Sequence, residues 1–574
     1  MDAQLRHCEM VSFIGFKQFI YSLEGMKIKT IYLFLDRHHI SVMGICVGLL
    51  FFSASLTPSL IPRSAVVQGT LGGMVMSIGY LFAKILIGIW RFLELPVLKD
   101  TRHRTVAGGF FIICLAIFCV ALFHLRGSQN ELRSLMTMSP LGGSHELIVV
   151  GLAVALFFFL LLLGRLVAII TRFLRNRMPG RMPPRVSITL SLTLITILSW
   201  NLGNGVIARG LLNMADEVLR EIDSRIDPDL PVPQDSLRSG SGESLISWDS
   251  LGAQGRRFVA GGRSAEEISE IYGGTPVKQP IRIYAGLNSA EDIKDRAALT
   301  LDEMKRVGAF ERSILIVATP TGTGWIDSAA VDPLEVMHRG DTAIVGMQYS
   351  YLMSPLALYV EPDVAPESAK ALVNIVHGHW RQLPADTRPK LFLHGLSLGS
   401  YGSENALSPL NMIDNPVNGA LWSGPTFGNP IWQNLTRNRN SDSPAWLPRI
   451  GDSRTARFTT QENALNIAGS SWSQMRLVFL QYASDPITFF EITSAFRPSA
   501  WMADERAPDV LENLRWYPLI TMLQIAVDML VAAEVPKGFG HVIAAEHYIN
   551  AWVALTDPEH WQEEDTEQLK EMFR

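Results

Sequence analysis

Residues 391–404 read "LFLHGLSLGSYGSE", in which a short apolar run meets a serine flanked by glycines. Gly395-Leu396-Ser397-Leu398-Gly399 fits the pattern G-x-S-x-G. The run 390–395 predicts a strand, and a helix is predicted to begin just after Ser397. A strand, sharp turn and helix around this pattern form a nucleophile elbow, where side chains on either side of the serine would clash with the backbone. Ser397 is therefore a candidate nucleophile, although the five residues alone also fit an ordinary glycine-rich turn.

Short apolar runs recur on both sides of this elbow and alternate with helical patterns. Helices are predicted near 289–307, 326–337 and 366–382. Strands are predicted at 281–286, 313–318, 342–348, 418–423 and 476–482. Such alternation predicts an α/β fold over residues 275–574, with a mostly parallel sheet and helices on both faces. In sheets of this kind, ligands bind at the carboxyl ends of the strands.

A serine hydroxyl needs a base to activate it, and the base needs an acid to orient it. Asp485 follows a predicted strand in "QYASDP" and is the candidate acid, unless it merely begins a turn. Three histidines follow it in the chain. His547 is predicted to lie within a helix and His560 in a polar tail, whereas His541 lies in the glycine-rich loop "KGFGH" and is the predicted base.

Two parts of the chain are predicted to supply the N–H groups that stabilise a developing oxyanion. One is the backbone N–H of Leu398, directly after the nucleophile. The other is the loop "TPTGTGW" (319–325), where Thr321 and Gly322 are the candidate donors, unless the loop is a plain turn. A phosphate-binding loop is excluded because no Gly-Lys-Ser/Thr follows.

The amino-terminal region predicts a membrane domain. Five apolar runs, near 40–60, 68–93, 105–124, 146–171 and 186–208, are long enough to cross about 30 Å of hydrocarbon as helices. The first starts too far from residue 1, and is too long, to be a cleaved signal peptide. The predicted organisation is an N-terminal segment (1–39), five transmembrane helices (40–208), an interfacial helix and linker (209–274), and the α/β domain (275–574).

Positive charges predict the orientation of these helices. Residues 1–39 and the loops 94–104 and 172–185 are rich in Lys and Arg, and the alternate loops are poorer. The positive-inside rule then places the amino terminus in the cytoplasm. Five crossings place the α/β domain on the extracytoplasmic side of what we expect to be a bacterial inner membrane. "SLTPSLIPR" (55–63), after the first run, predicts a structural turn, with a lipid or substrate contact as the alternative.

Composition narrows the possible partners. The net charge is −5, which gives no bulk basic character for binding nucleic acid. The four cysteines, Cys8, Cys46, Cys114 and Cys119, all precede the α/β domain. A disulfide framework or a cysteine-based metal site is therefore not available to that domain. We expect no metal and no cofactor, and the sequence does not indicate an oligomeric state.

The chain resembles the bacterial membrane-anchored α/β-hydrolases, which join a multi-helix domain to a catalytic domain. The stretches that carry this resemblance run from about 55 to 530. They are "SLTPSLIPR", "SWDSLGAQGRRFVAGG", "RIYAGLNSA", "VATPTGTGWIDSAAVD", "GDTAIVGMQYSYL", "GLSLGSYGSE", "QYASDPITFF" and "RWYPLITMLQIAVDML". The chain departs from the family at Leu396, where glutamate is usual. Residues 515–533 are also predicted to form a helix, whereas the usual pattern of this family has a strand before the histidine. The resemblance implies a serine hydrolase and leaves the substrate open.

Together these features predict a membrane-embedded serine hydrolase that cleaves an ester, which the membrane origin suggests is lipophilic. Ser397 would form an acyl-enzyme, with His541 and Asp485 completing the triad. Two alternatives remain: an acyltransferase using the same triad, and a non-catalytic membrane scaffold or transport component. The insertion 424–475, with three tryptophans, fits either a lid or an ordinary surface loop.

Overall fold

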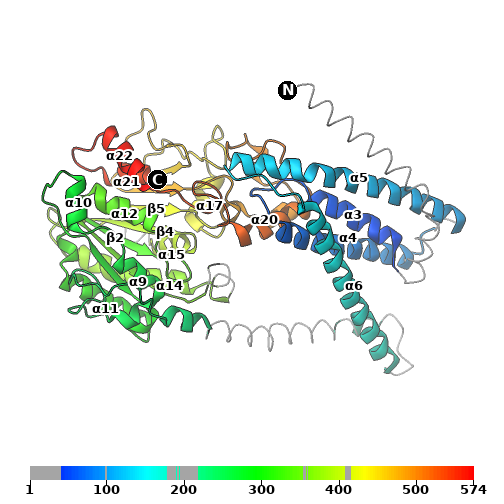
Figure 1. The fold of residues 1–574 in the computed structure, drawn as a ribbon, viewed down its shortest axis with the longest axis horizontal. Helices are drawn as coiled ribbons and strands as arrows, with labels where there is room; N and C mark the ends of the chain where they lie inside the picture. The colour runs from blue at the N-terminus through cyan, green and yellow to red at the C-terminus, as the bar shows by residue number, and fades with distance from the viewer. Residues whose placement is uncertain are drawn as a thin grey trace. The chain divides into compact units, whose positions relative to one another are not determined.

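The computed structural model describes residues 40–96, 100–177, 218–352, 360–407 and 415–574, with a few single residues between these ranges. These residues form two compact units. The first contains the amino-terminal helices and the second contains the sheet (Figure 1). Two short segments from the helical region, Ser59–Pro62 and Leu132–Ser139, belong by their contacts to the second unit.

Among the described residues, four helices lie wholly or mostly in the first unit: α3 (Val42–Ser55), α4 (Ala65–Phe92), α5 (Asp100–Leu135) and α6 (His145–Arg177). Three of them contain stretches long and apolar enough to cross a membrane, at Ala65–Phe92, Val106–Leu135 and His145–Phe173. Large apolar side chains such as Phe123 and Phe159 are exposed along α5 and α6, as expected of helices that face lipid. The chain is thus a membrane-associated protein.

The first predicted crossing is shorter than its apolar run. Helix α3 has 14 residues, which corresponds to about 21 Å at 1.5 Å per residue. It ends where the turn 55–63 begins. Arg63 is buried in that turn, with its backbone N–H on Oε1 of Gln129 and its Nη1 on Oε1 of Gln68. The fifth predicted crossing, 186–208, lies outside the described residues apart from a few single positions, so five crossings stay a prediction.

A seven-stranded parallel sheet forms the core of the second unit, which confirms the predicted fold class. The strands follow the order β1-β3-β2-β4-β5-β7-β6. Most of their residues are buried, and most of the buried ones are apolar. Their bounds are β1 (Ile281–Ala285), β2 (Ile314–Thr319), β3 (Thr342–Met347), β4 (Lys390–Leu396), β5 (Gly419–Ser423), β6 (Ala456–Thr459) and β7 (Arg476–Leu480).

Helices cover both faces of this sheet. Because parallel crossovers are right-handed, connections running in opposite directions along the sheet lie on opposite faces. The first layer holds α11 (Ile293–Arg306), α14 (Val364–Trp380) and α15 (Leu398–Ala406), with α14 in contact with the other two. The second holds α12 (Ser328–Met337), α21 (Ala545–Thr556) and α22 (Glu563–Phe573). The strands' carboxyl ends meet at one edge, where the elbow lies.

Part of the predicted linker 209–274 packs into the core of this unit. Helices α9 (Gly252–Ala260) and α10 (Ala265–Ile271) bury Phe258 and Ile268 against the same cluster as the strands. Asp223, in a helical stretch at 218–224, accepts hydrogen bonds from Ala253 N and Gln348 Nε2. The earlier residues of the interfacial helix lie outside the described residues.

The insertion 424–475 is ordered against the sheet. It contributes α17 (Pro430–Arg437) and the edge strand β6, which pairs with β7. Its tryptophans are used in packing. Trp432 donates to Gln481 Oε1 at 2.6 Å, Trp446 donates to Glu505 O at 2.8 Å, and Trp472 lies under the guanidinium of Arg457.

Candidate active site

Ser397 occupies a strained backbone conformation between β4 and α15. Its φ of 57° and ψ of −123° are unusual for a residue with a side chain, and strain of this kind gathers at functional sites. A Cβ at Gly395 would collide with Gly399 O, and one at Gly399 would collide with Thr319 O. The two glycines therefore permit the turn and allow β2 to approach it closely.

Asp485 lies in the loop after β7, as the sequence predicts, and is buried. Its Oδ1 accepts a hydrogen bond from Ile487 N at 2.8 Å, which starts the short helix α18 (Pro486–Phe489). Its Oδ2 lies 3.0 Å from Thr488 Oγ1 and 2.6 Å from Nδ1 of His541. The carboxylate is thus held from one side while it faces the imidazole.

His541 contacts Asp485 through one of its two ring nitrogens. Nδ1 contacts Asp485, so Nε2 is the nitrogen left to accept a proton. Nε2 is buried and has no hydrogen-bond partner among the described residues. The His541 backbone N–H donates to Ala532 O at 3.0 Å. Asp485 therefore contacts the candidate base as a candidate orienting acid would.

The end of β5 connects His541 to the elbow. A Cβ at Gly424 would lie 2.7 Å from Cε1 of His541 and 3.4 Å from Cδ1 of Leu396. Leu396 is the residue before Ser397, and Ser397 N donates to Ser423 O at 3.0 Å. His541 thus lies next to the elbow. No hydrogen bond joins its Nε2 to Ser397 among the described residues, and catalytic hydrogen bonds of free enzymes are often long until substrate binds.

The predicted oxyanion residues lie around the same turn. Leu398 is the first residue of α15, whose amino-terminal N–H groups have no partners within the helix. The loop after β2 touches this helix, because Gly399 packs on Thr319 and Pro320. Both candidate amides of that loop are engaged. Thr321 N donates to Trp325 O at 2.9 Å, and Gly322 N donates to Ser354 Oγ at 3.2 Å.

The other two candidate histidines are not placed to act as the base. His547 lies in α21, where its Nδ1 is 2.5 Å from the hydroxyl of Tyr482. Burial lowers the pKa of His547 to about 4. His560 is exposed in the turn before α22. His541 is therefore the one that the fold brings to Asp485.

Ser484 is a supporting residue that the sequence did not indicate. Its Oγ accepts a hydrogen bond from Gly540 N at 3.0 Å, and its own N–H donates to Asp509 Oδ2 at 2.9 Å. Consecutive residues of the acid loop thus hold consecutive residues of the base loop. Only its position beside Asp485 could have suggested this role.

Glu404 is a second supporting residue, buried on α15 two turns after Ser397. Its Oε1 accepts from the backbone N–H groups of Ile431 and Trp432, and its Oε2 accepts from Asn429 Nδ2 at 2.8 Å. Burial raises the pKa of Glu404 to about 7 despite these donors. The contacts fasten α17, in the insertion, to α15.

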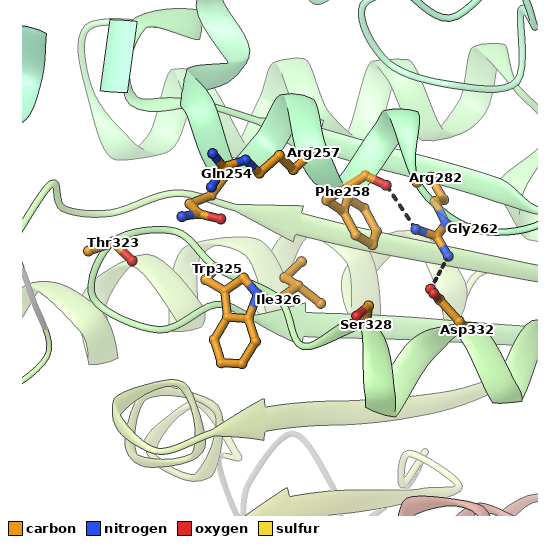
Figure 2. A pocket seen from close by; sticks show the side chains of 11 residues that line it. Gln254, Arg257, Phe258, Gly262, Arg282, Thr323, Trp325, Ile326, Ser328 and Asp332 are labelled. Atoms are coloured by element: carbon orange, nitrogen blue, oxygen red, sulfur yellow. Dashed lines mark hydrogen bonds and ion pairs between the residues drawn. The ribbon is translucent and has the colours of Figure 1, made fainter. Parts of the chain in front are cut away.

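A pocket of about 490 Å³ lies away from these residues, between α9, β1 and α12 (Figure 2). Trp325 and Thr323, from the loop after β2, form one wall. The buried Arg282 forms another, paired with Asp332 at 2.6 Å and Glu335 at 2.7 Å. Ser397, Asp485 and His541 do not line it. The charges of its buried wall are compensated within the protein.

Among the described residues, no group of three or more His, Cys, Asp or Glu side chains is arranged to hold a metal ion.

Comparison with known proteins agrees with the fold. The profile of the alpha/beta-hydrolase family matches residues 281–569, and the profile of that family's amino-terminal region matches residues 56–262. No curated protein and no solved structure matched the chain.

Proposed function

Because the chain belongs to the alpha/beta-hydrolase family, we propose that it is a membrane-embedded serine hydrolase that cleaves an ester through an acyl-enzyme. One observation carries the proposal. Beside a G-x-S-x-G elbow, the imidazole of His541 lies 2.6 Å from Asp485, and its Nε2 has no hydrogen-bond partner among the described residues. That arrangement is what a serine needs to become a nucleophile.

The reaction follows from these positions. Nε2 of His541 takes the proton of Ser397 Oγ as the oxygen bonds to the ester carbonyl carbon. The imidazolium then returns the proton to the leaving alcohol as the ester C–O bond breaks. Water, activated by the same nitrogen, attacks the acyl-serine and releases the acid and free Ser397. Asp485 stabilises the imidazolium in both steps.

The oxyanion would be stabilised by the N–H of Leu398 and by a donor from the loop after β2. Since the amides of Thr321 and Gly322 already have partners, the second donor requires one of them to be released when substrate binds, or the hydroxyl of Thr321. Each such donor is worth about 10²–10³-fold in rate.

The substrate class follows from the setting. The described residues include three helices able to cross a membrane, and a protein held there would meet lipophilic esters in that membrane. We place it in a bacterial inner membrane with the amino terminus inside and the hydrolase unit outside, from the distribution of Lys and Arg in the loops.

The test is covalent labelling of isolated membranes with a fluorophosphonate probe. We expect wild type to be labelled, Ser397→Ala to be silent and His541→Ala to be strongly reduced. His560→Ala, which changes an exposed histidine, should label as wild type does. A folded wild-type protein that stays unlabelled while a control hydrolase reacts would refute the proposal.

Labelled protein should then be given ester substrates with and without a competing alcohol. Free acid as the main product in both cases supports hydrolysis. An ester of the added alcohol would show acyl transfer instead.

A further inference from the structure

Helix α20 (Ile520–Asp528) turns its polar side chains toward the protein interior. Thr521, Gln524 and Asp528 are buried, spaced three and four residues apart on one face. Thr521 Oγ1 accepts a hydrogen bond from Tyr517 N at 2.8 Å, and Asp528 accepts one from Ser59 Oγ. The polar face of this helix is therefore satisfied inside the hydrolase unit.

The outward side of the same helix is apolar. Met522, Leu523, Ala526 and Val527 are only partly buried, and Leu530, in the turn η6 (Met529–Val531) that ends the helix, is 72% exposed. A helix facing water has the opposite arrangement. An apolar helix of this length (Ile520–Val531) is typical of buried or interfacial segments.

A second segment extends this apolar surface. The turn η5 (Ile492–Ala495) is bound to the start of α20, since Leu519 N donates to Ala495 O at 2.9 Å. Ile492 is 70% exposed and Phe496 is 85% exposed. We call the surface that carries Ile492, Phe496 and Leu530 the α20 face. Both η5 and η6 contact α20, and exposed large apolar side chains on neighbouring elements mark interaction sites.

The chain itself points to lipid as the occupant. Hydrocarbon requires polar groups to be satisfied internally, and the polar groups Thr521 and Asp528 are satisfied in this way. The residue that binds Asp528, Ser59, lies in the segment Ser59–Pro62, between the apolar helices α3 and α4. The helix with an outward apolar surface is thus bound by a segment continuous with membrane helices.

We propose that the α20 face inserts into the headgroup and acyl boundary of the bilayer that holds the transmembrane helices. Amphipathic segments of this kind enter that boundary by about 5–10 Å. Leu530 precedes by two residues Ala532, whose carbonyl accepts from His541 N. Ile492 follows the helix that Asp485 begins. The loops that carry Asp485 and His541 are therefore close in sequence to Ile492 and Leu530 of the α20 face.

This placement also names the substrate class, a point that rests on the proposed hydrolase activity. An ester carried by a membrane lipid would reach the triad at the surface where it already resides, without passing through water.

Spin labels test the insertion directly. All four native cysteines precede the hydrolase unit's sheet and can be replaced by alanine. Single cysteines at positions 492, 496 and 530 are labelled in full-length protein reconstituted into phosphatidylcholine–phosphatidylglycerol vesicles. The matched control is position 245, where Leu245 is 52% exposed beside Glu303 of α11.

We expect oxygen to relax the labels at 492, 496 and 530 several-fold more than a water-soluble nickel chelate does, and the reverse at 245. Equal access to the nickel chelate at all four positions would overturn the proposal. So would labels shielded from both reagents, because these would show a protein partner.

An activity measurement tests the substrate class. In the variant I492S/F496S/L530S, hydrolysis of an ester embedded in vesicles should fall at least several-fold, and hydrolysis of a water-soluble acetate ester should not change. Loss of both activities would show a structural role and refute the inference. If wild type hydrolyses neither ester, the proposed function fails, and the spin labels still decide the insertion.

Discussion

Oδ2 of Asp485 lies 2.6 Å from Nδ1 of His541, although the two residues are 56 positions apart in the chain. The contact joins the loop after β7 to the loop before α21. It is the relationship on which the proposed chemistry depends most directly, and it can be disturbed in several independent ways.

Replacing Asp485 with Asn should reduce the rate of ester hydrolysis by about three to four orders of magnitude, because the amide favours the wrong imidazole tautomer. The measurement is kcat/KM on a chromogenic ester, with circular dichroism to verify folding. Asp442→Asn, which changes an exposed ion pair with Arg449, should keep full activity. Activity near wild type in folded Asp485→Asn would remove Asp485 from the mechanism.

Gly424→Ala should displace His541, since the new Cβ would lie 2.7 Å from Cε1 of the ring. A displacement of about 1 Å can cost about 10²-fold in rate. Gly451→Ala is the matched control. Its φ of 51° is close to the 47° of Gly424, but a Cβ there meets nothing within 4 Å. Equal activity of the two variants would show that backbone strain, and not the position of His541, causes any loss.

Ser484→Ala should lower kcat while the protein remains folded. It leaves the buried N–H of Gly540 without its acceptor, which costs about 1–3 kcal/mol, and it frees the loop that carries His541. Ser494→Ala removes another buried hydroxyl, the one that donates to Glu491 O, and serves as the control. Thermal unfolding and kcat are measured for both. A similar fall in stability with a loss of kcat only at Ser484 supports a positioning role.

Glu404 should make the stability of the hydrolase unit depend on pH. Burial raises its pKa from the usual 4.5 to about 7, so the folded state binds the proton more tightly than the unfolded state. Between pH 4.5 and 7 the contribution of Glu404 to the free energy of unfolding falls as pH rises, by about 3 kcal/mol in total. In Glu404→Gln the apparent Tm should drop by several degrees less than in wild type between pH 5 and 8. Parallel pH curves would contradict the assignment.

Much of the fold follows from local patterns. The six predicted strands consist mostly of β-branched or apolar residues because parallel strands are buried on both faces. Strand β6 was not predicted from the sequence. Its four residues, "ARFT", include Arg457, whose charge is accommodated by the carbonyls of Ser453 and Leu465 and by the ring of Trp472. Contacts of that kind leave no pattern in a short stretch of sequence.

The site divides in the same way. Ser397 is predicted from the glycines that flank it. Asp485 and His541 are predicted from their order in the chain after Ser397 and from the loops in which they lie. Sequence patterns do not predict the supporting roles of Ser484 and Glu404, because these roles depend on partners that the sheet brings together. Helix α3 ends earlier than hydropathy suggests, since hydropathy does not register the buried polar turn at 55–63.

The hydrogen bond from Ser59 to Asp528 spans 469 positions. During biosynthesis it can therefore form only long after Ser59 has been made. At about 5–20 residues per second, the ribosome would complete Asp528 roughly 20–90 s after Ser59. Until then Leu60, which ends buried in the core beside the strands, has no cavity to fill. The hydrolase unit therefore closes last around a segment that was made among the first, and a nascent chain arrested before Asp528 should leave that segment open to protease.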